Sequence, residues 1–371
     1  MSPELIPSVD PSGLPGPVWL FQFLLVLTFF LHILFLNLTL GGSILAAVAQ
    51  TLGGGREDDP RTRLASRLTG VNGFAISLTI TTGVAPLLFI QLLYQQFFYA
   101  ATILLGWIWF WLLILLTIGY YAVYLHKLGG GGGPRKGSGL LWVAAVLFLL
   151  IAGIHVAVNL VHSQPGTWQN MAGSSWAFLA DPTYVPRLLH FVFAGIAFSA
   201  LVMVWWSVRQ VGRGADIEAN RAMAAFAWKW ALWSTAAQVV DGFVFLMLIP
   251  SDILVPFMRG GAATMGPLTL GIILAVGILF MLARVKDPCE RPALVNGTLA
   301  TMVGAILVMI VTRHQVRGLS LAEVADLGQY TVRPQWGNFA LFAVILLAGL
   351  ATVYWMVRKV LNEPATGADA A

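Results

Sequence analysis

The histidines are the residues of this sequence best suited to chemistry, and one of them opens the stretch "HILFLNLTLGG" (32–42). The chain has six histidines and one cysteine, at His32, His126, His155, His162, His190, His314 and Cys289. An imidazole without a partner is costly among apolar side chains, so these rings are functional candidates. Imidazole nitrogen binds haem iron, copper and zinc. A single cysteine cannot form a CxxCH haem attachment or a thiolate cluster, so we expect histidine, methionine or carboxylates to hold any cofactor.

Arginines accompany two of the histidines. Arg187 precedes His190 by three residues, and Arg313 and Arg317 flank His314. On a helix, His314 and Arg317 share one face, so the imidazole could bind haem iron while the guanidinium meets a propionate. These pairs favour haem as the cofactor.

A second pair of histidines lies seven residues apart on one predicted helix. His155 and His162 would share a face, about 10 Å apart along the axis. That spacing suits two cofactors, or one cofactor and a partner that supports its ligand. The chain also has 22 Phe, 14 Trp and 11 Met, which could form the bulky apolar walls that a haem needs.

Membrane-spanning helices must position these side chains. The chain is 58% hydrophobic and only 10% charged, with a mean hydropathy of +0.81, against roughly 25% charged residues in a soluble domain. Nine apolar stretches are long enough to cross a bilayer: about Val18 to Ala49, Val71 to Leu93, Ala101 to Leu125, Leu140 to Val161, Leu188 to Val208, Ala222 to Leu248, Met265 to Leu282, Ala293 to Thr312 and Phe339 to Val357. The first is too long for a signal peptide, so we expect it to remain as a span. We predict an all-α, polytopic membrane bundle of about nine helices, formed by a single domain (1–371).

The positive charges alternate between loops. Lys and Arg concentrate in the loops after spans 1, 3, 5, 7 and 9 and are fewer in the others. The positive-inside rule therefore places the N-terminus outside and the C-terminus inside. We expect the membrane to be a bacterial inner membrane. The net charge of +5 reflects this topology, so we expect no nucleic-acid partner. The long outer segments 162–187 and 313–338 are expected to fold over the outer surface, and the glycine-rich 129–139 is expected to be a flexible connector.

On this topology five histidines share the outer half of the membrane. They come from four spans: His32, His155, His162, His190 and His314. Packing alone does not require such a grouping, and a ligand role is the default for intramembrane ionisable residues. His126 lies at the inner end, where an interhelical hydrogen bond or water contact accounts for it better.

One acid, Asp241 in "QVVDGFVF", stands inside an apolar span. It could serve a proton path or orient a ligand. A plain interhelical pair with Gln238 or with a histidine explains it equally well.

Four segments resemble subunit I of the cytochrome bd-type quinol oxidases. "HILFLNLTLGG" is similar to the family's opening helix, where a haem-ligating histidine precedes a Leu-Thr-Leu-Gly run. "GVNGFAISLTITTG" (70–83) resembles the second helix, "VNLVHSQPG" (158–166) the exit of the fourth, and "RLLHFVFAGIAFSALVM" (187–203) the fifth. Nine spans with an outer N-terminus also match. The chain is identified as a divergent member, with its specific marks around His32 and His190.

The resemblance implies roles for two histidines. His32 stands where the family binds the haem of its oxygen-reducing site. His190 stands where the family holds a low-spin haem b, whose second ligand is a methionine at the outer start of the seventh span. Met265 matches that methionine best, and Met258 is the alternative.

The resemblance also places the remaining histidines. The family's third haem takes an acidic residue three positions before an arginine, and here His314 precedes Arg317. His162 falls where the family usually has methionine, and His155 has no counterpart. The implied cofactors are two or three haem b groups, with a high-spin or d-type haem as the alternative at one site.

Two departures from the family bear on function. The third span, "ATILLGWIWFWLLILLTIGYYAVYL" (101–125), has none of the acids that serve the family's oxygen site. The link "PSDILVPFMRGGA" (250–262) is short where the family has a long quinol-binding loop. Dioxygen reduction needs proton donors near the metal, so we expect neither oxygen chemistry nor quinol oxidation at the usual places.

Added histidines favour electron transfer instead, because a haem with two imidazole ligands is six-coordinate and has no open position. We predict a membrane b-type multihaem subunit that relays electrons near the periplasmic face. Its partners would be a periplasmic cytochrome c or other redox protein, a quinone or oxidase partner, and other membrane subunits. Two alternatives stay open: a terminal oxygen reductase with His32 on an open haem, and a haem-free anchor or transporter.

Overall fold

The computed structural model describes residues 6–8, 11–129 and 137–362, and helices make up most of them. The helices are α1 (Val18–Leu52), α2 (Pro60–Leu93), α3 (Gln95–Leu105), α4 (Trp107–Leu128), α5 (Gly139–Ser163), α6 (Trp168–Gly173), α7 (Tyr184–Gly212), α8 (Ile217–Leu248), α9 (Ser251–Arg259), α10 (Ala262–Arg284), α11 (Pro292–Ser320) and α12 (Trp336–Asn362). Within the described residues, nine of these are long and apolar enough to cross a membrane. The predicted all-α polytopic bundle is therefore confirmed.

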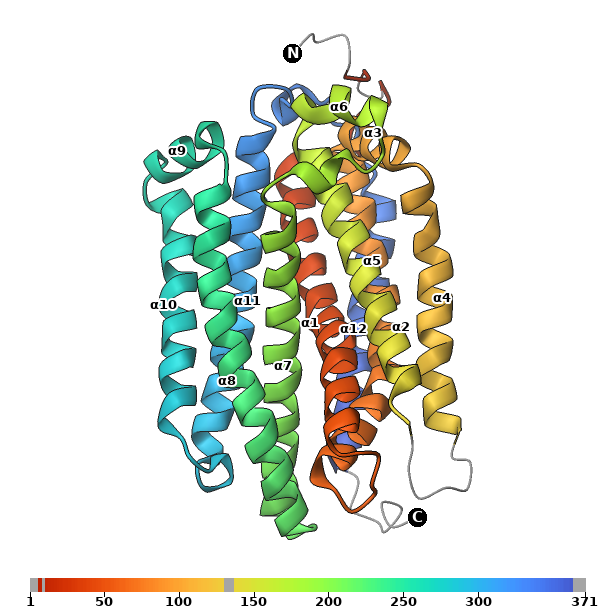
Figure 1. Cartoon of the computed structure of the whole chain (residues 1–371). Coiled ribbons are helices and arrows are strands. Elements are labelled where there is room, and N and C mark those ends of the chain that lie inside the picture. Colours follow the sequence, from red (N-terminus) through yellow and green to blue (C-terminus); the bar gives the residue numbers. More distant parts are fainter. Residues whose placement is uncertain (1–5, 9–10, 130–136, 363–371) are drawn as a thin grey trace.

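The spans run alternately up and down, and α1 lies near the middle of the bundle (Figure 1). It packs against α2, α5 and α7, and α7 packs along α8. In Figure 1, α3, α6 and α9 lie at the end where α1 begins, here called the upper end; α12 finishes at the opposite, lower end.

The two halves of the core differ in their side chains. The upper half contains bulky rings, including Phe21, Phe89, Phe97, Phe98 and Trp168. The lower half is rich in small residues between α1, α2 and α7, such as Ala46, Ala65 and Ala197. Small residues let helix backbones approach closely, whereas the upper half supplies the apolar walls expected near the histidines.

The third predicted span differs from the structure at one point. The stretch Ala101 to Leu125 was expected to be one helix, but the chain breaks at Gly106, which has φ of +50°. Residues with a side chain rarely adopt this conformation. The break separates the short helix α3 from the span α4, so Ala101 belongs to the upper end rather than to the third span.

The two long segments expected to cover one surface both lie at the upper end (Figure 1). Segment 162–187 forms α6 and a short turn of 3₁₀-helix, Ala177–Ala180. Segment 313–338 is tied to the start of the chain, because the Leu14 N–H donates to the Thr331 carbonyl (2.8 Å) and the Arg333 N–H donates to the Leu14 carbonyl (2.8 Å).

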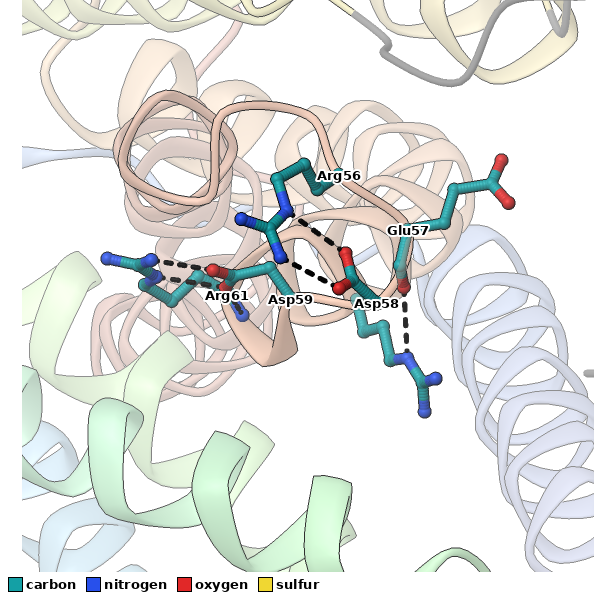
Figure 2. Close-up of polar contacts among 6 residues, drawn as sticks. Arg56, Glu57, Asp58, Asp59 and Arg61 are labelled. Atoms are coloured by element: carbon teal, nitrogen blue, oxygen red, sulfur yellow. Dashed lines mark hydrogen bonds and ion pairs between the residues drawn. The ribbon is translucent and has the colours of Figure 1, made fainter.

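Charged residues at the lower end pair with one another. In the loop between α1 and α2, Arg56 pairs with Asp58 (2.8 Å) and Arg61 with Asp59 (2.6 Å), as Figure 2 shows. Arg63 also pairs with Asp216, which joins this loop to the one before α8. Exposed pairs of this kind contribute little stability, but they give these acids and arginines an evident structural role.

Candidate functional site

His32 is held in α1 by contacts with α2. Its Nδ1 lies 3.0 Å from the Thr79 carbonyl oxygen, which can only accept, so Nδ1 carries the proton. Nε2 then keeps a free lone pair, the form of imidazole that binds a metal. A carbonyl on the other ring nitrogen is a usual partner of a metal-ligating histidine.

His155 lies close enough to His32 for the two rings to interact electrostatically. Its Nδ1 is 3.0 Å from the carbonyl of Ile151, one turn earlier in α5, which again leaves Nε2 free. The ring also contacts Trp109 of α4 edge to face, with centroids 5.7 Å apart. The structure thus brings together two of the predicted ligands, both with available nitrogens.

Gly83 of α2 leaves the space that the His32 ring occupies. A Cβ at this position would stand 2.8 Å from Cε1 and 2.9 Å from Nδ1 of that ring. We expect Gly83→Ala to push the ring away from Thr79 while the fold is retained, since a side chain can move where a backbone cannot. Haem content and the reduced-minus-oxidised spectrum of the purified variant measure this displacement.

Gly70→Ala is the matched control, because a Cβ at Gly70 of the same helix meets nothing within 4 Å. It should match the wild-type spectrum. Identical spectra for both variants would contradict the placement of His32 against Gly83.

A second group lies at the upper end, and we call it the rim cluster: His162, His314, Arg187, Arg313 and Arg317, from α5, α7 and α11. Electrostatic interactions link its members. His162 is 1% exposed and Arg317 is 6% exposed. No carboxylate of the described residues forms an ion pair with any of the three arginines.

The hydrogen-bond and ring partners of the arginines are neutral, although Arg187 also interacts electrostatically with Asp181. Arg313 donates to the Asn159 side-chain oxygen of α5 (2.6 Å) and lies over the Phe29 ring, 4.6 Å from its centroid. Arg187 lies over Phe245 at 4.9 Å, and Arg317 lies over Tyr94 at 5.8 Å. Burying cations with so little counter-charge is costly, so an anionic group bound here would stabilise the cluster.

Tyr94 lies against both Arg317 and His162 of the rim cluster. It follows the end of α2, is 2% exposed, and contacts His162 edge to face with ring centroids 5.8 Å apart. Burial raises the pKa of the Tyr94 phenol, although nearby Arg317 opposes the shift. The phenol therefore stays neutral at physiological pH.

Four nitrogens of the rim cluster are buried without any hydrogen-bond partner: His162 Nε2, His314 Nδ1, Arg187 Nε and Arg317 Nε. Buried polar groups almost always have partners, so a bound ligand or water would satisfy these atoms. Haem fits their chemistry, since its iron takes imidazole nitrogen and its propionates take guanidinium groups.

His190 stands apart from both groups, between α7 and α8. Its Nδ1 is 3.2 Å from the Asp241 carboxylate, and its Nε2 is 3.4 Å from the Gln238 side-chain nitrogen. Asp241 therefore pairs with a histidine, which was one of the two structural alternatives. His126, in contrast, is 9% exposed near the lower end of α4.

The methionines proposed as partners of His190 are less well placed by the structure. Met265 lies in the first turn of α10 and is partly buried, whereas Met258 on α9 is 55% exposed. Helix α10 packs mainly on α8 and α11, so the pairing of Met265 with His190 stays a prediction.

The histidines do not form a cage for a bare ion. Within the described part of the chain, no three His, Cys, Asp or Glu side chains converge on a point where a metal could sit. Structural zinc sites need four protein ligands and catalytic ones three, whereas haem iron needs one or two. The observed spread of imidazoles therefore fits haem better than zinc.

Sequence reasoning missed several residues that support the candidates. Thr79, Gly83, Tyr94 and Asn159 all act across helix interfaces. The quoted second-helix segment contains Thr79 and Gly83, but only the three-dimensional register shows that they face His32.

No family model and no curated protein matches this chain. Among solved structures, bd oxidase from Geobacillus thermodenitrificans is similar, with a TM-score of 0.73 and 15% sequence identity. The match covers 94% of this chain and 99% of that chain. The chain therefore has the bd oxidase fold, as its resemblance to subunit I implied, and the low identity is that of a divergent sequence.

Proposed function

We propose that this protein is a b-type multihaem electron-transfer subunit of a respiratory membrane complex, with its haems near the periplasmic face. The observation that carries the proposal is the rim cluster, where buried histidine and arginine nitrogens lack partners. One buried and two partly buried arginines without a paired carboxylate have little structural value. They are well suited to neutralise propionates.

The residues divide into ligands and anion-binding groups. His32 and His155 would hold one haem, His162 and His314 another, and His190 with Met265 a third. Arg187, Arg313 and Arg317 bind propionates, and Tyr94 and Asn159 fix the positions of the arginines. Haem b, when bound, supplies a one-electron carrier.

Electron transfer is favoured over oxygen reduction by the surroundings of His32. His155 interacts electrostatically with it and keeps a free nitrogen, so both rings would be available to hold one haem. The span α4 has no Asp or Glu to supply protons to such a site. The link between α8 and α10 is only the short helix α9 and its flanking residues, so we assign quinol binding to no loop there. The partners are a periplasmic cytochrome c or other redox protein on one side and a quinone or oxidase subunit on the other.

A pyridine haemochrome assay with a reduced-minus-oxidised spectrum of the purified protein tests the proposal. We expect two or three haem b per chain, all with low-spin spectra. Purified protein without haem would overturn the proposal and favour an anchor or transporter. A five-coordinate haem together with oxygen consumption from quinol or reduced cytochrome c would establish the oxidase alternative.

A further inference from the structure

Asp241 has a buried carboxylate directed at His190. Its side chain is 9% exposed, the His190 side chain is 27% exposed, and Asp241 Oδ2 lies 3.2 Å from His190 Nδ1. A Cβ on the neighbouring Gly242 would stand 3.2 Å from His190 Cε1. The α8 backbone therefore lies against the ring edge and leaves it little freedom to turn.

Both polar partners specify the same form of the ring. A carboxylate accepts, so Asp241 accepts a hydrogen bond from a protonated Nδ1. The Gln238 amide nitrogen donates, so Nε2 must be the unprotonated acceptor. The contact with Gln238 is long, at 3.4 Å. The lone pair of Nε2 is thus only weakly hydrogen-bonded, so it is available to a metal.

Three other histidines have uncharged partners on Nδ1. His32 and His155 face backbone carbonyls, and His162 faces the Ser163 hydroxyl (3.2 Å). His190 forms the one histidine–carboxylate pair among the residues that the structure describes. A charged acceptor makes a stronger hydrogen bond than a neutral one, so His190 differs from the rest in electronic character.

We propose that Asp241 is a positioning residue for His190: it fixes the tautomer that exposes Nε2 and makes the ring a stronger donor to iron. This rests on the proposed function. A carboxylate on the other ring nitrogen raises ligand basicity, and loss of such a partner typically costs 10–100-fold in metal affinity. A stronger donor favours ferric over ferrous iron. Asp241 therefore lowers the midpoint potential of the haem bound by His190 and of no other.

Potentiometric titration of the purified holoprotein compares Asp241→Asn, Asp241→Glu and Asp252→Asn. Asparagine keeps the size of the side chain and removes its charge; glutamate restores a carboxylate. Asp252 is an exposed acid at the start of α9, at the same end of the bundle, so its variant removes an equal charge without touching His190.

We expect Asp241→Asn to raise one midpoint potential, by about 59 mV for a tenfold change in the ferric-to-ferrous affinity ratio of a one-electron couple. Asp241→Glu should lie near wild type, and Asp252→Asn should shift nothing. Loss of that haem in Asp241→Asn with retention in Asp241→Glu would support the same role. Equal effects in the Asn and Glu variants, or an Asn variant that matches Asp252→Asn, would overturn it. Wild-type protein without haem would instead remove the proposed function on which the inference rests.

Discussion

His162→Ala is expected to lose one of the two or three haem equivalents per chain. His162 is 1% exposed, its Nε2 is buried without a partner, and Nδ1 is occupied by Ser163. No nearby residue of α5 can replace its ring nitrogen, because His155 lies two turns away and interacts electrostatically with His32. Haem per protein, measured by pyridine haemochrome, should therefore fall by one whole equivalent per chain.

Two further variants separate ligation from packing. His126→Ala removes a similarly buried imidazole, 9% exposed, at the lower end, and should keep the full haem content. His162→Met supplies the residue that the bd-type family usually has at this place, so it should retain haem with a changed spectrum and a raised potential. Full haem in His162→Ala, or equal loss in the two alanine variants, would contradict a ligand role.

The fold could be predicted from hydropathy, because each crossing needs about 20 apolar residues whatever its neighbours are. All nine spans were found in this way. The break at Gly106 could not be, since the residues on both sides are equally apolar and only the backbone angle of one glycine separates α3 from α4. The start of α2 was placed too late, at Val71, because its first turns are polar; the Asp59 side chain caps the helix before Pro60.

The rim cluster was partly predictable for a different reason. Local spacing joins His314 to Arg317, and opposite span directions bring His162 to the same level. Which residues meet across helices depends on rotation and register, which hydropathy does not encode. Tyr94 and Asn159 therefore escaped notice. The partner of Asp241 was left open between Gln238 and a histidine; the structure pairs Asp241 with His190, whose other ring nitrogen contacts Gln238.

Gly41→Ala is expected to destabilise the whole bundle. Gly41 of α1 faces Gly195 of α7 so closely that a Cβ on Gly41 would collide with the Gly195 carbonyl group and with the Ile196 nitrogen. Backbone atoms cannot turn away as a side chain can, so the two helices must separate. Overpacking lowers the free energy of unfolding by roughly 1–3 kcal/mol and occasionally more. We expect Gly41→Ala to lower it by an amount at or above the upper end of this range. Because α1 and α7 carry His32 and His190, the separation should also reduce haem retention.

The two glycines of this crossing are expected to differ in how well they tolerate a side chain. A Cβ on Gly195 would stand 3.2 Å from the Gly41 nitrogen and 3.4 Å from the Asn37 carbonyl oxygen, a tight but tolerable contact. Gly195→Ala should therefore cost much less than Gly41→Ala. Gly304→Ala on α11 is the control, since its Cβ meets nothing within 4 Å, and it should be neutral or stabilising by about 0.5–1 kcal/mol. Thermal unfolding in detergent, with size-exclusion profiles, ranks the three variants. Similar melting temperatures for Gly41→Ala and Gly304→Ala would show that α1 and α7 do not cross at Gly41 and Gly195.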